Sequence, residues 1–512
     1  METLLDLLQG FEVALSPLNL SLAVLGAVAG TLVGALPGLG PANGVAILIP
    51  IAFTIGLPPE SALIFLATVY YGAMYGGRIS SIMLNIPGDE TAVMTLLEGY
   101  PMARQGRAGT ALAITAVASF VGATIATIGL TFLAPALVRL ALLFGPAEYF
   151  LIYVLAFSLL GGLAGGNMLK TFIACALGLM ISTVGLDYAT NVPRYTFGQM
   201  KLFDGLDPII TIVGFFAISE VLIFFESMHA TARIKITVGR AYATFKELVG
   251  CLGATLRGSL IGFVAGVLPG AGASLGSFAA YVLERRYSDR GTFGTGDPRG
   301  LAAPEAGNNA AAGGALVPML ALGVPGSGTT AILLALLIAL NITPGPLLFE
   351  QRPEIAWGLI ASLYLGNVIL LILNLPLVGI FVRLLMIPTF VLLPSITLLC
   401  FVGIYGISHS TFDIFMMVGV GVFGYLLRKV GIPLVPVILA VLLGPQMEVN
   451  LRRALSLSDG GWGILFGSPT AIVLWVLIVL GLVLPLLWGL WTSGSTRERE
   501  GADDPGAVKK GW

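Results

Sequence analysis

The stretch GALPGLGPANG, residues 34–44, interrupts a long apolar run with the pattern Leu-Pro-Gly-x-Gly. Proline and glycine at this spacing end a helix and leave backbone groups without helical partners. The stretch GVLPGAGASLG, residues 266–276, repeats the pattern in the second half of the chain.

A second pair of motifs follows in the same order. NIPGDET occupies residues 85–91, and GVPGSGT occupies residues 323–329. Two ordered matches predict one duplicated unit, with slightly more chain between the motifs in the later copy. Matched breaks in two hydrophobic halves are the strongest indication in a sequence of a transporter binding site.

The composition excludes a water-soluble globule. The 512 residues are 57% hydrophobic and 10% charged, whereas soluble domains carry about 25% charged residues. A formal charge of −1 gives no basis for a nucleic-acid partner. Cys175, Cys251 and Cys400 lie scattered in apolar runs and predict neither a disulfide nor a metal site. The first cation is Arg78, so no basic signal peptide is expected.

The fold class expected is an all-α polytopic membrane protein with about 10–12 transmembrane helices, some broken or re-entrant. Membrane segments are predicted near 17–36, 43–57, 60–77, 108–133, 134–165 with a break at Pro146, 167–186, 208–226, 247–268, 273–284, 307–322, 328–342, 355–385, 389–406, 412–427, 432–444 and 467–491. The short segments 43–57, 273–284, 328–342 and 432–444 cannot cross about 30 Å and predict half-helices.

These segments predict six regions. They are an N-terminal segment 1–16, a membrane repeat 17–186, a linker 187–246 with one span and a basic loop, a second repeat 247–406, C-terminal membrane segments 407–492, and a disordered tail 493–512. The basic loop, 229–246, contains four cations and no acid, so it is expected to be cytoplasmic. The two repeats are expected to be inverted, because that arrangement brings both breaks to the midplane.

Helices that begin inside a membrane suit an anion. Their free N–H groups and partial positive charge face whatever lies in front of them, and glycine lets a ligand approach the backbone. Hydroxyl, amide and carbonyl oxygens at the same junctions could coordinate Na⁺. The alternative is that the glycines serve only close helix packing. The predicted substrate- or ion-binding residues are Pro37, Gly38, Gly40, Asn43, Pro87, Gly88, Asp89, Thr91, Pro269, Gly270, Gly272, Ser274, Asn308, Asn309, Pro325, Gly326, Ser327 and Thr329.

Two acidic residues are candidates for ion coupling. Glu220 lies inside an apolar run, where an ionisable residue is a functional candidate by default, although it could also lie near an interface. Glu305 precedes Asn308 and Asn309 in APEAGNNAAAGGALVP, residues 303–318. At the entrance of an apolar helix these three residues could cap the helix or form a polar lining.

No hydrolytic constellation is visible. His229 and His409 lie far apart, and the sequence contains no HExxH motif. We therefore expect no enzyme, no catalytic residues, no resident metal and no cofactor; Na⁺ or H⁺ would be transported as the coupling ion. The alternatives from other classes are a membrane enzyme and a non-transporting assembly subunit.

The chain resembles the large membrane subunit, TctA, of the bacterial tripartite tricarboxylate transporters. The matching blocks are GALPGLGPANGVAILIP, YGGRISSIMLNIPGDETAV, VPRYTFGQMKLFDGLD, AAPEAGNNAAAGGALVPMLALGVPGSGTTAILL and ILAVLLGPQMEVNLRRAL. The resemblance implies an ion-coupled secondary carrier of citrate-like carboxylates in the bacterial inner membrane. It also implies two partners, a small four-helix membrane subunit (TctB-like) and a periplasmic solute-binding protein (TctC-like).

A related possibility is the large subunit of a tripartite ATP-independent periplasmic (TRAP) carrier for another organic anion, which has similar parts and different motifs. The sequence has no Walker motif, so this subunit is not expected to use ATP directly.

Overall fold

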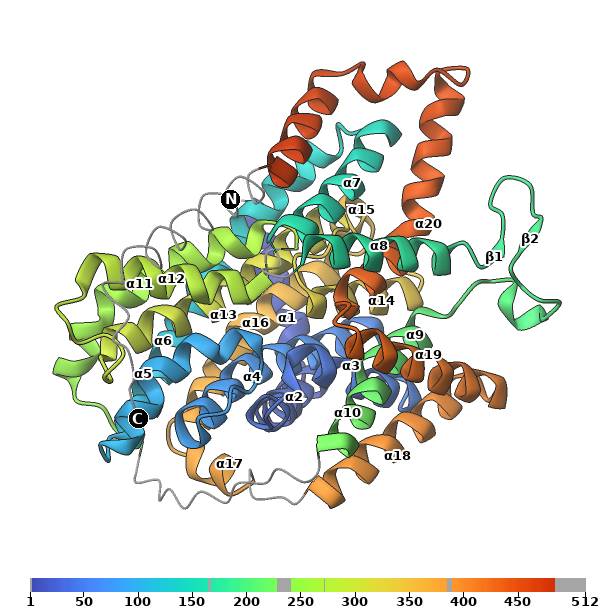
Figure 1. The fold of residues 1–512 in the computed structure, drawn as a ribbon. Coiled ribbons are helices and arrows are strands. Elements are labelled where there is room, and N and C mark those ends of the chain that lie inside the picture. The colour runs from blue at the N-terminus through green and yellow to red at the C-terminus, as the bar shows by residue number, and fades with distance from the viewer. Residues whose placement is uncertain (1, 164–166, 228–240, 271, 385–388, 484–512) are drawn as a thin grey trace, which may run out of the picture.

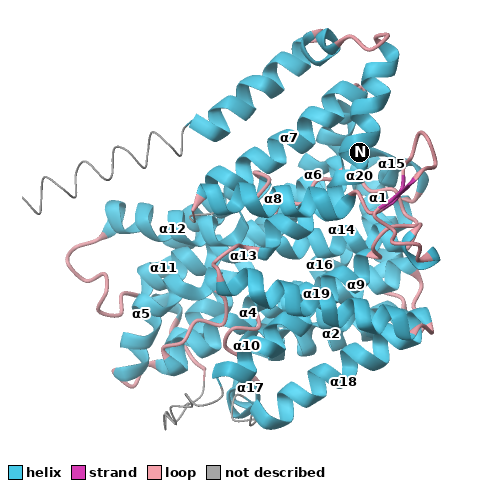
Figure 2. Ribbon diagram, turned by 45° about the vertical axis from the view of Figure 1, so that its right-hand side comes forward, coloured by secondary structure: helices cyan, strands magenta, loops and turns pink. Residues whose placement is uncertain are grey.

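The computed structural model describes residues 2–163, 167–227, 241–270, 272–384 and 389–483. Within them the chain is a helical bundle with one two-stranded antiparallel ribbon, β1 (Gly185–Leu186) and β2 (Pro193–Arg194) (Figures 1 and 2). Seven of the described helices are long and apolar enough to span a membrane, and shorter apolar helices accompany them. The expected all-α polytopic membrane fold is confirmed.

The first half begins with α1 (Glu2–Ala14), which packs against α16 (Pro353–Asn374) of the second half. The next elements are α2 (Pro17–Ala35), α3 (Gly40–Thr54), α4 (Pro59–Leu84), η1 (Glu90–Ala92), α5 (Val93–Arg104), α6 (Ala108–Ala141), α7 (Pro146–Leu163) and α8 (Met168–Ser182). The segment predicted at 108–133 is longer than expected, because α6 continues through Pro135 for 34 residues. The predicted break at Pro146 is the start of α7.

A polar interval follows, at one end of the bundle, and the loop 289–297 lies at the other end (Figures 1 and 2). Within the interval, Asp187 forms ion pairs with Arg194, at 3.3 Å, and with Arg452 of α20 (Leu434–Leu457), at 2.9 Å. A backbone hydrogen bond from Thr190 leads the effects that lower the pKa of Asp187 to about 2. The carboxylate therefore stays ionised near neutral pH and ties the interval to α20.

The chain then forms one apolar span, Pro208–Glu226, from three short helices. They are α9 (Pro208–Ile212), the π-helical turn η3 (Val213–Ile218) and α10 (Ser219–Ser227); η2 (Met200–Leu202) precedes them. Most of the predicted basic loop 229–246, and all of the predicted tail 493–512, lie outside the described residues.

The second half again has a long helix, a break, a half-helix and a buried central helix in that order. Its elements are α11 (Phe245–Val267), α12 (Gly272–Ser288), α13 (Pro298–Leu322), α14 (Gly328–Ala339), α15 (Pro346–Gln351), α16 and α17 (Val378–Leu384). The C-terminal elements are α18 (Thr389–Ser408), α19 (Thr411–Lys429), α20, η4 (Trp462–Phe466) and a helix at Pro469–Val483.

Two expected boundaries are wrong. The helix that carries Glu305 starts at Pro298, with Asp297 as its N-cap, so Glu305 lies inside α13 and does not cap it. Aspartate before proline is a strong start signal, and it takes precedence over the later Pro304. The segment 432–444 is not a half-helix, because α20 continues past Pro445 to Leu457 and has 24 residues.

Matched rows of glycine hold the central helices together. Gly26, Gly30 and Gly34 of α2 face α4 so closely that a Cβ on any of them would overlap a carbonyl oxygen of α4. In the second repeat Gly258, Gly262 and Gly266 of α11 face the carbonyls of α13 in the same way. Small residues at a spacing of four let membrane helices pack by backbone contact. We call these rows the glycine stripes.

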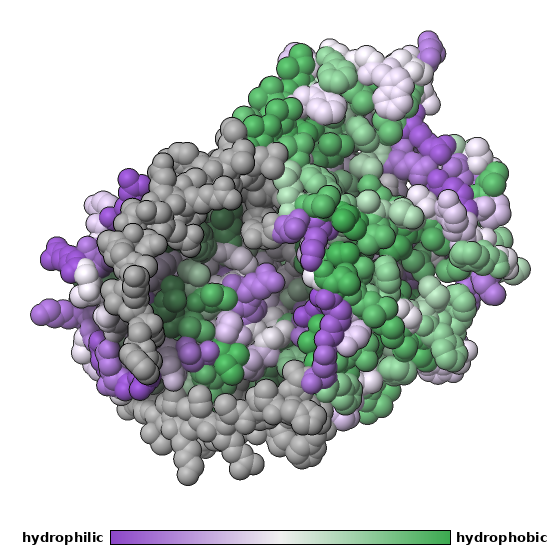
Figure 3. Space-filling view, viewed as in Figure 1, coloured by the Kyte–Doolittle hydropathy of each residue, from purple (hydrophilic) through white to green (hydrophobic). Residues whose placement is uncertain are grey.

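The two helices that receive the glycine stripes form the centre of the molecule. All residues of α4 from Ser61 to Met83, and all residues of α13 from Gly300 to Ala321, are buried. In Figure 3 apolar side chains cover much of the right-hand part of the visible surface, with hydrophilic groups at the left-hand edge and others near β1 and α20.

Candidate functional site

Each of the two Leu-Pro-Gly-x-Gly breaks is a turn that contains two left-handed glycines. Between α2 and α3, Gly38 has a φ of 85° and Gly40 a φ of 62°. Between α11 and α12, Gly270 has a φ of 79° and Gly272 a φ of 64°. Glycine adopts positive φ without steric cost. The pattern Leu-Pro-Gly-x-Gly thus produces the same turn in both halves.

A backbone hydrogen bond joins the two breaks of each repeat. The N–H of Gly38 donates to the carbonyl oxygen of Gly88 over 3.0 Å, and the N–H of Gly270 donates to that of Gly326 over 3.2 Å. The two donors occupy the same place in the first motif pair, and the two acceptors occupy the same place in the second. Contrary to expectation, these backbone groups are paired, because one break supplies the partner for the other. The bond fixes two helix starts relative to each other.

The acceptor glycines sit against the central helices. An ideal Cβ on Gly88 would lie 2.5 Å from Gly77 Cα of α4, and one on Gly326 would lie 2.7 Å from Ala315 Cα of α13. Glycine at these two positions is required by the approach of the chain to a helix. A proline precedes the glycine at all four breaks: Pro37, Pro87 and Pro269 are half-buried and Pro325 is buried.

Asp89 and Ser327 occupy equivalent positions and cap the helices that follow. The Asp89 carboxylate accepts hydrogen bonds from Ala92 N, at 3.0 Å, and from the Thr91 hydroxyl, at 2.7 Å. The Ser327 hydroxyl accepts from Thr330 N at 3.3 Å, and Thr330 Oγ1 accepts from Ser327 N at 2.8 Å. N-cap side chains satisfy N–H groups of the first helical turn. Some of the N–H groups at these helix starts, which we expected to bind a ligand, are therefore already paired with side chains of the protein.

The breaks of the two repeats meet each other. The half-helix α3 packs against α14, and its counterpart α12 packs against η1. An ideal Cβ on Gly40 would lie 3.1 Å from Asp89 Cβ. Groups from both repeats thus surround one junction.

Glu220 lies at the first break. Asn43 Nδ2 donates to Glu220 Oε2 over 3.2 Å, and Arg428 of α19 forms an ion pair with the same oxygen. A Cβ on Gly38 would lie 3.9 Å from Glu220 Oε1. The π-helical turn η3 ends at Ile218, two residues before Glu220, and such turns occur frequently at functional sites. The structure brings together three residues that the sequence singled out separately, and it adds Arg428, which no sequence pattern linked to them.

Glu305 belongs to a buried polar cluster between the repeats. Its two carboxylate oxygens accept hydrogen bonds from Ser119 of α6, at 2.9 Å, and from Thr95 of α5, at 2.8 Å. Asn309, one helical turn after Glu305, donates to Ser119 Oγ over 2.9 Å. Arg78 of α4 donates to the same oxygen over 3.3 Å. The cluster therefore joins α13 of the second repeat to three helices of the first.

Three further predicted residues lie within two positions in sequence of residues described above. Asn308 and Thr329 are buried, and Ser274 is half-buried in the first turn of α12. Asn308 Oδ1 has no hydrogen-bond partner among the described residues.

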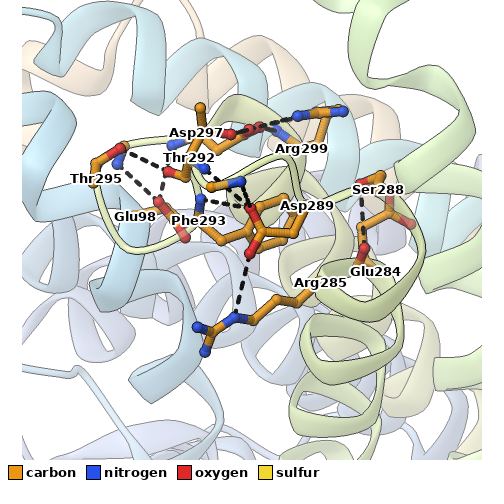
Figure 4. Close-up of polar contacts among 12 residues, drawn as sticks. Glu98, Glu284, Arg285, Ser288, Asp289, Thr292, Phe293, Thr295, Asp297 and Arg299 are labelled. Carbon is orange, nitrogen blue, oxygen red and sulfur yellow. Dashed lines mark hydrogen bonds and ion pairs between the residues drawn. The ribbon is translucent and has the colours of Figure 1, made fainter.

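Glu98 is a buried carboxylate that the sequence did not single out. It lies on α5 and accepts hydrogen bonds from the backbone N–H groups of Gly294, Gly296 and Asp297 in the loop that leads into α13 (Figure 4). The Tyr281 hydroxyl of α12 adds a fourth hydrogen bond at 3.0 Å. Glu98 thus fastens the first repeat to the loop between two helices of the second.

Comparisons with known proteins identify the family. The model of the "Tripartite tricarboxylate transporter TctA family" matches residues 20–439. The chain is 39% identical over 491 residues, 95% of this chain and 97% of the relative, to the "Uncharacterized 52.8 kDa protein in TAR-I ttuC' 3'region" of Agrobacterium vitis. It is also 39% identical over 244 residues, 48% of this chain and 100% of the relative, to the "Uncharacterized protein in TAR-II ttuC' 3'region" of the same organism. No solved structure matches.

These matches agree with the features already described. The matched range begins in α2 and ends in α20, so it contains both pairs of breaks and both glycine stripes. The helices that can span a membrane and the paired breaks are those of a multi-pass transport protein. The chain belongs to the tripartite tricarboxylate transporter TctA family.

Proposed function

We propose that this chain is the translocating subunit of an importer of di- or tricarboxylates such as citrate, driven by an inward cation gradient, with Na⁺ preferred to H⁺. The observation that supports this best is the matched pair of backbone hydrogen bonds, Gly38 to Gly88 and Gly270 to Gly326. In each repeat the bond fixes two helix starts relative to each other. Paired interruptions of this kind suit a substrate site that two rigid repeats expose alternately.

The junction suits an anion. The half-helix α3 packs against α14, and α12 packs against η1. A helix N-terminus carries about half a positive charge and donor N–H groups. Carboxylates are recognised well by such groups. A substrate with two or three carboxylates would satisfy N-termini from both repeats at once.

Coupling follows from the membrane potential. An anion that moves into a negative-inside cell costs about 2.3 kcal/mol per charge per 100 mV, which co-transported cations offset. The oxygens of Asn43 and Glu220 at the first break, and those of Asp89 and Thr91 at the break hydrogen-bonded to it, are of the kind that coordinates Na⁺. We propose that the cation binds among them.

The family assignment supports an assembly of several subunits. We propose that the partners are a small four-helix membrane subunit and a periplasmic solute-binding protein, and that the complex lies in the bacterial inner membrane. The binding protein would deliver the carboxylate at one end of the bundle, either to the polar interval or, at the opposite end, to the loop 289–297.

The proposal is tested by uptake into proteoliposomes that contain both membrane subunits, with the binding protein outside. We expect accumulation of labelled citrate or a related carboxylate under an inward Na⁺ gradient, and no accumulation when the binding protein is omitted. Accumulation that persists after both the Na⁺ and the H⁺ gradients are collapsed would reject ion coupling. Liposomes that take up none of the carboxylates offered would reject the carboxylate substrate.

A further inference from the structure

Arg78 carries an unused pair of hydrogen-bond donors at the centre of the molecule. The side chain is buried, at 1% exposure, on α4. Its Nη1 donates to Ser119 Oγ, but Nε and Nη2 have no hydrogen-bond partner among the described residues. Buried polar groups are nearly always paired, and a buried charge is costly unless it is matched. An arginine in this condition at membrane depth is a functional candidate by default.

The two free donors form a recognition edge. The Nε–H and the outer Nη–H of a guanidinium point the same way and match the two oxygens of a carboxylate. The rest of the group is held in place: Nη1 is bound to Ser119, and Cζ lies 5.1 Å from the centre of the Tyr75 ring. The Tyr75 hydroxyl donates in turn to Asn367 of α16. The edge is therefore presented by a fixed arginine, which lowers the cost of binding.

Glu305 does not occupy this edge. Both of its oxygens already accept hydrogen bonds from neutral donors, at 2.9 Å from Ser119 and 2.8 Å from Thr95. Glu305 lowers the cost of the buried cation through its field, while the donors of Arg78 stay available.

Packing alone does not require a cation at this position. Gly88 packs on Gly77 in the first repeat, and its counterpart Gly326 packs on Ala315 in the second. The residue equivalent to Arg78 is therefore Leu316, which is fully buried in α13. The same place in the second repeat is filled by an apolar side chain.

Arg78 is also close to the paired breaks. Its chain neighbour Gly77 packs against Gly88, and a Cβ on Gly77 would lie 3.5 Å from Asp89 Oδ1. Thr95, which binds Glu305, lies on α5 directly after η1. A single substrate molecule with several carboxylates could therefore reach from the helix starts to the arginine.

We propose that Arg78 binds one carboxylate of the transported substrate through Nε and Nη2, with Ser119, Tyr75 and Glu305 as its positioning residues. The inference rests on the proposed carboxylate transport and names the side chain that recognises the anion. Because Arg78 is buried, the substrate would reach it only when the helices around the cluster separate, as alternating access requires. The helix starts would then bind the remaining carboxylates.

The test is a binding cycle between protein and ligand. The dissociation constants of citrate, tricarballylate and succinate, and of the monoamide of each, are measured by calorimetry on the purified chain in lipid nanodiscs. In the wild type the loss of one carboxylate should weaken binding about tenfold or more, the scale of a charge-assisted hydrogen bond. The Arg78→Lys variant keeps the charge and loses the planar edge. Relative to the wild type, it should bind each acid more weakly by a similar factor, and its affinity for the corresponding monoamide should fall by much less.

The matched control is Arg352→Lys, the same change at a half-exposed arginine, which should leave every constant unchanged. Unchanged binding of the monoamide also shows that Arg78→Lys is folded at the site. The inference is overturned if acid and monoamide weaken by the same factor in Arg78→Lys, or if neither weakens. A wild type that binds none of the three acids would instead reject the proposed function, and the inference with it.

Discussion

Gly270 packs directly against Leu160 of α7: a Cβ on Gly270 would lie 2.8 Å from Leu160 Cγ and 3.1 Å from its backbone nitrogen. Its counterpart Gly38 has open surroundings, with the Phe224 ring as the nearest neighbour, at 3.4 Å from an ideal Cβ. The two turns have the same backbone and different environments. Only the first leaves room beside the glycine, so a small side chain can probe it without disrupting a neighbouring helix.

Gly38→Ala should fold and should lower transport. The left-handed backbone makes alanine cost about 1–2 kcal/mol, and the added methyl would stand where a substrate approaches. Gly88→Ala should lower the yield of folded protein sharply, because its methyl would meet Gly77 Cα. Gly419→Ala, in open surroundings on α19, is the control and should change neither quantity. Melting temperature and uptake per folded molecule are measured for all three. Normal uptake by folded Gly38→Ala would contradict a substrate site at this break.

Gly262→Ala should destabilise the protein by about 1–3 kcal/mol, because its methyl would overlap the carbonyl oxygen of Gly307 and push α11 from α13. Gly250 lies on the same helix and has nothing within 4 Å of an ideal Cβ. Gly250→Ala should therefore be neutral or stabilise by up to about 1 kcal/mol. Thermal unfolding in detergent measures both. Equal melting temperatures for the two variants would show that the stripe does not hold the helices together.

Arg428→Ala should destabilise far more than Lys429→Ala, although the two are neighbours that each form an ion pair. The partner of Arg428 is Glu220, whose side chain is 6% exposed, whereas the partner of Lys429 is Glu226, at 51%. Removal of one member of a fully buried pair costs about 3–5 kcal/mol, and an exposed pair contributes at most about 1 kcal/mol. Because Arg428 is itself 33% exposed, its loss should cost an amount between these limits. Adding Glu220→Gln to Arg428→Ala should restore much of the loss. If the double variant recovers no stability, the unpaired Glu220 carboxylate is not the cause of the destabilisation.

Glu98→Gln should loosen the loop before α13. In the wild type both carboxylate oxygens accept hydrogen bonds from backbone N–H groups. The amide keeps only one acceptor oxygen, and its NH₂ group would face N–H groups that need an acceptor. Hydrogen exchange at Gly294, Gly296 and Asp297 should accelerate about tenfold or more. Glu90→Gln, at an exposed position earlier in the same segment, should leave exchange there unchanged. Unchanged protection in Glu98→Gln would mean that the loop holds its shape without the carboxylate.

The sequence predicted the breaks well because their cause is local. Proline followed by glycine at a fixed spacing ends a helix wherever it occurs, so the starts of α3 and α12 at Gly40 and Gly272 could be predicted within the motifs. The glycine stripes are also visible in the sequence, as glycines at a spacing of four from Gly26 and from Gly258. That spacing indicates helix packing, but it does not name the partner helix.

The side-chain partners could not be predicted, because they join distant segments. Glu220 and Arg428 are far apart in the chain, as are Glu305 and Ser119. One sequence contains no signal that connects such pairs. The start of α13 was missed for a different reason: Pro304 resembles a helix start, and Asp297 with Pro298 looks like the end of the preceding hydrophilic loop.

The burial of α4 and α13 has a consequence for biosynthesis. Neither is among the described helices that are apolar enough to span a membrane on their own, so the translocon should release them poorly into lipid as single segments. A glycosylation-reporter assay on isolated α13 should record weak insertion, improved when α11 precedes it. In the nascent chain α2 emerges before α4, and α11 emerges before α13. Each weakly apolar helix therefore follows the helix whose glycine stripe packs against it. The order of the elements thus lets each repeat recruit its own central helix into the bilayer during synthesis.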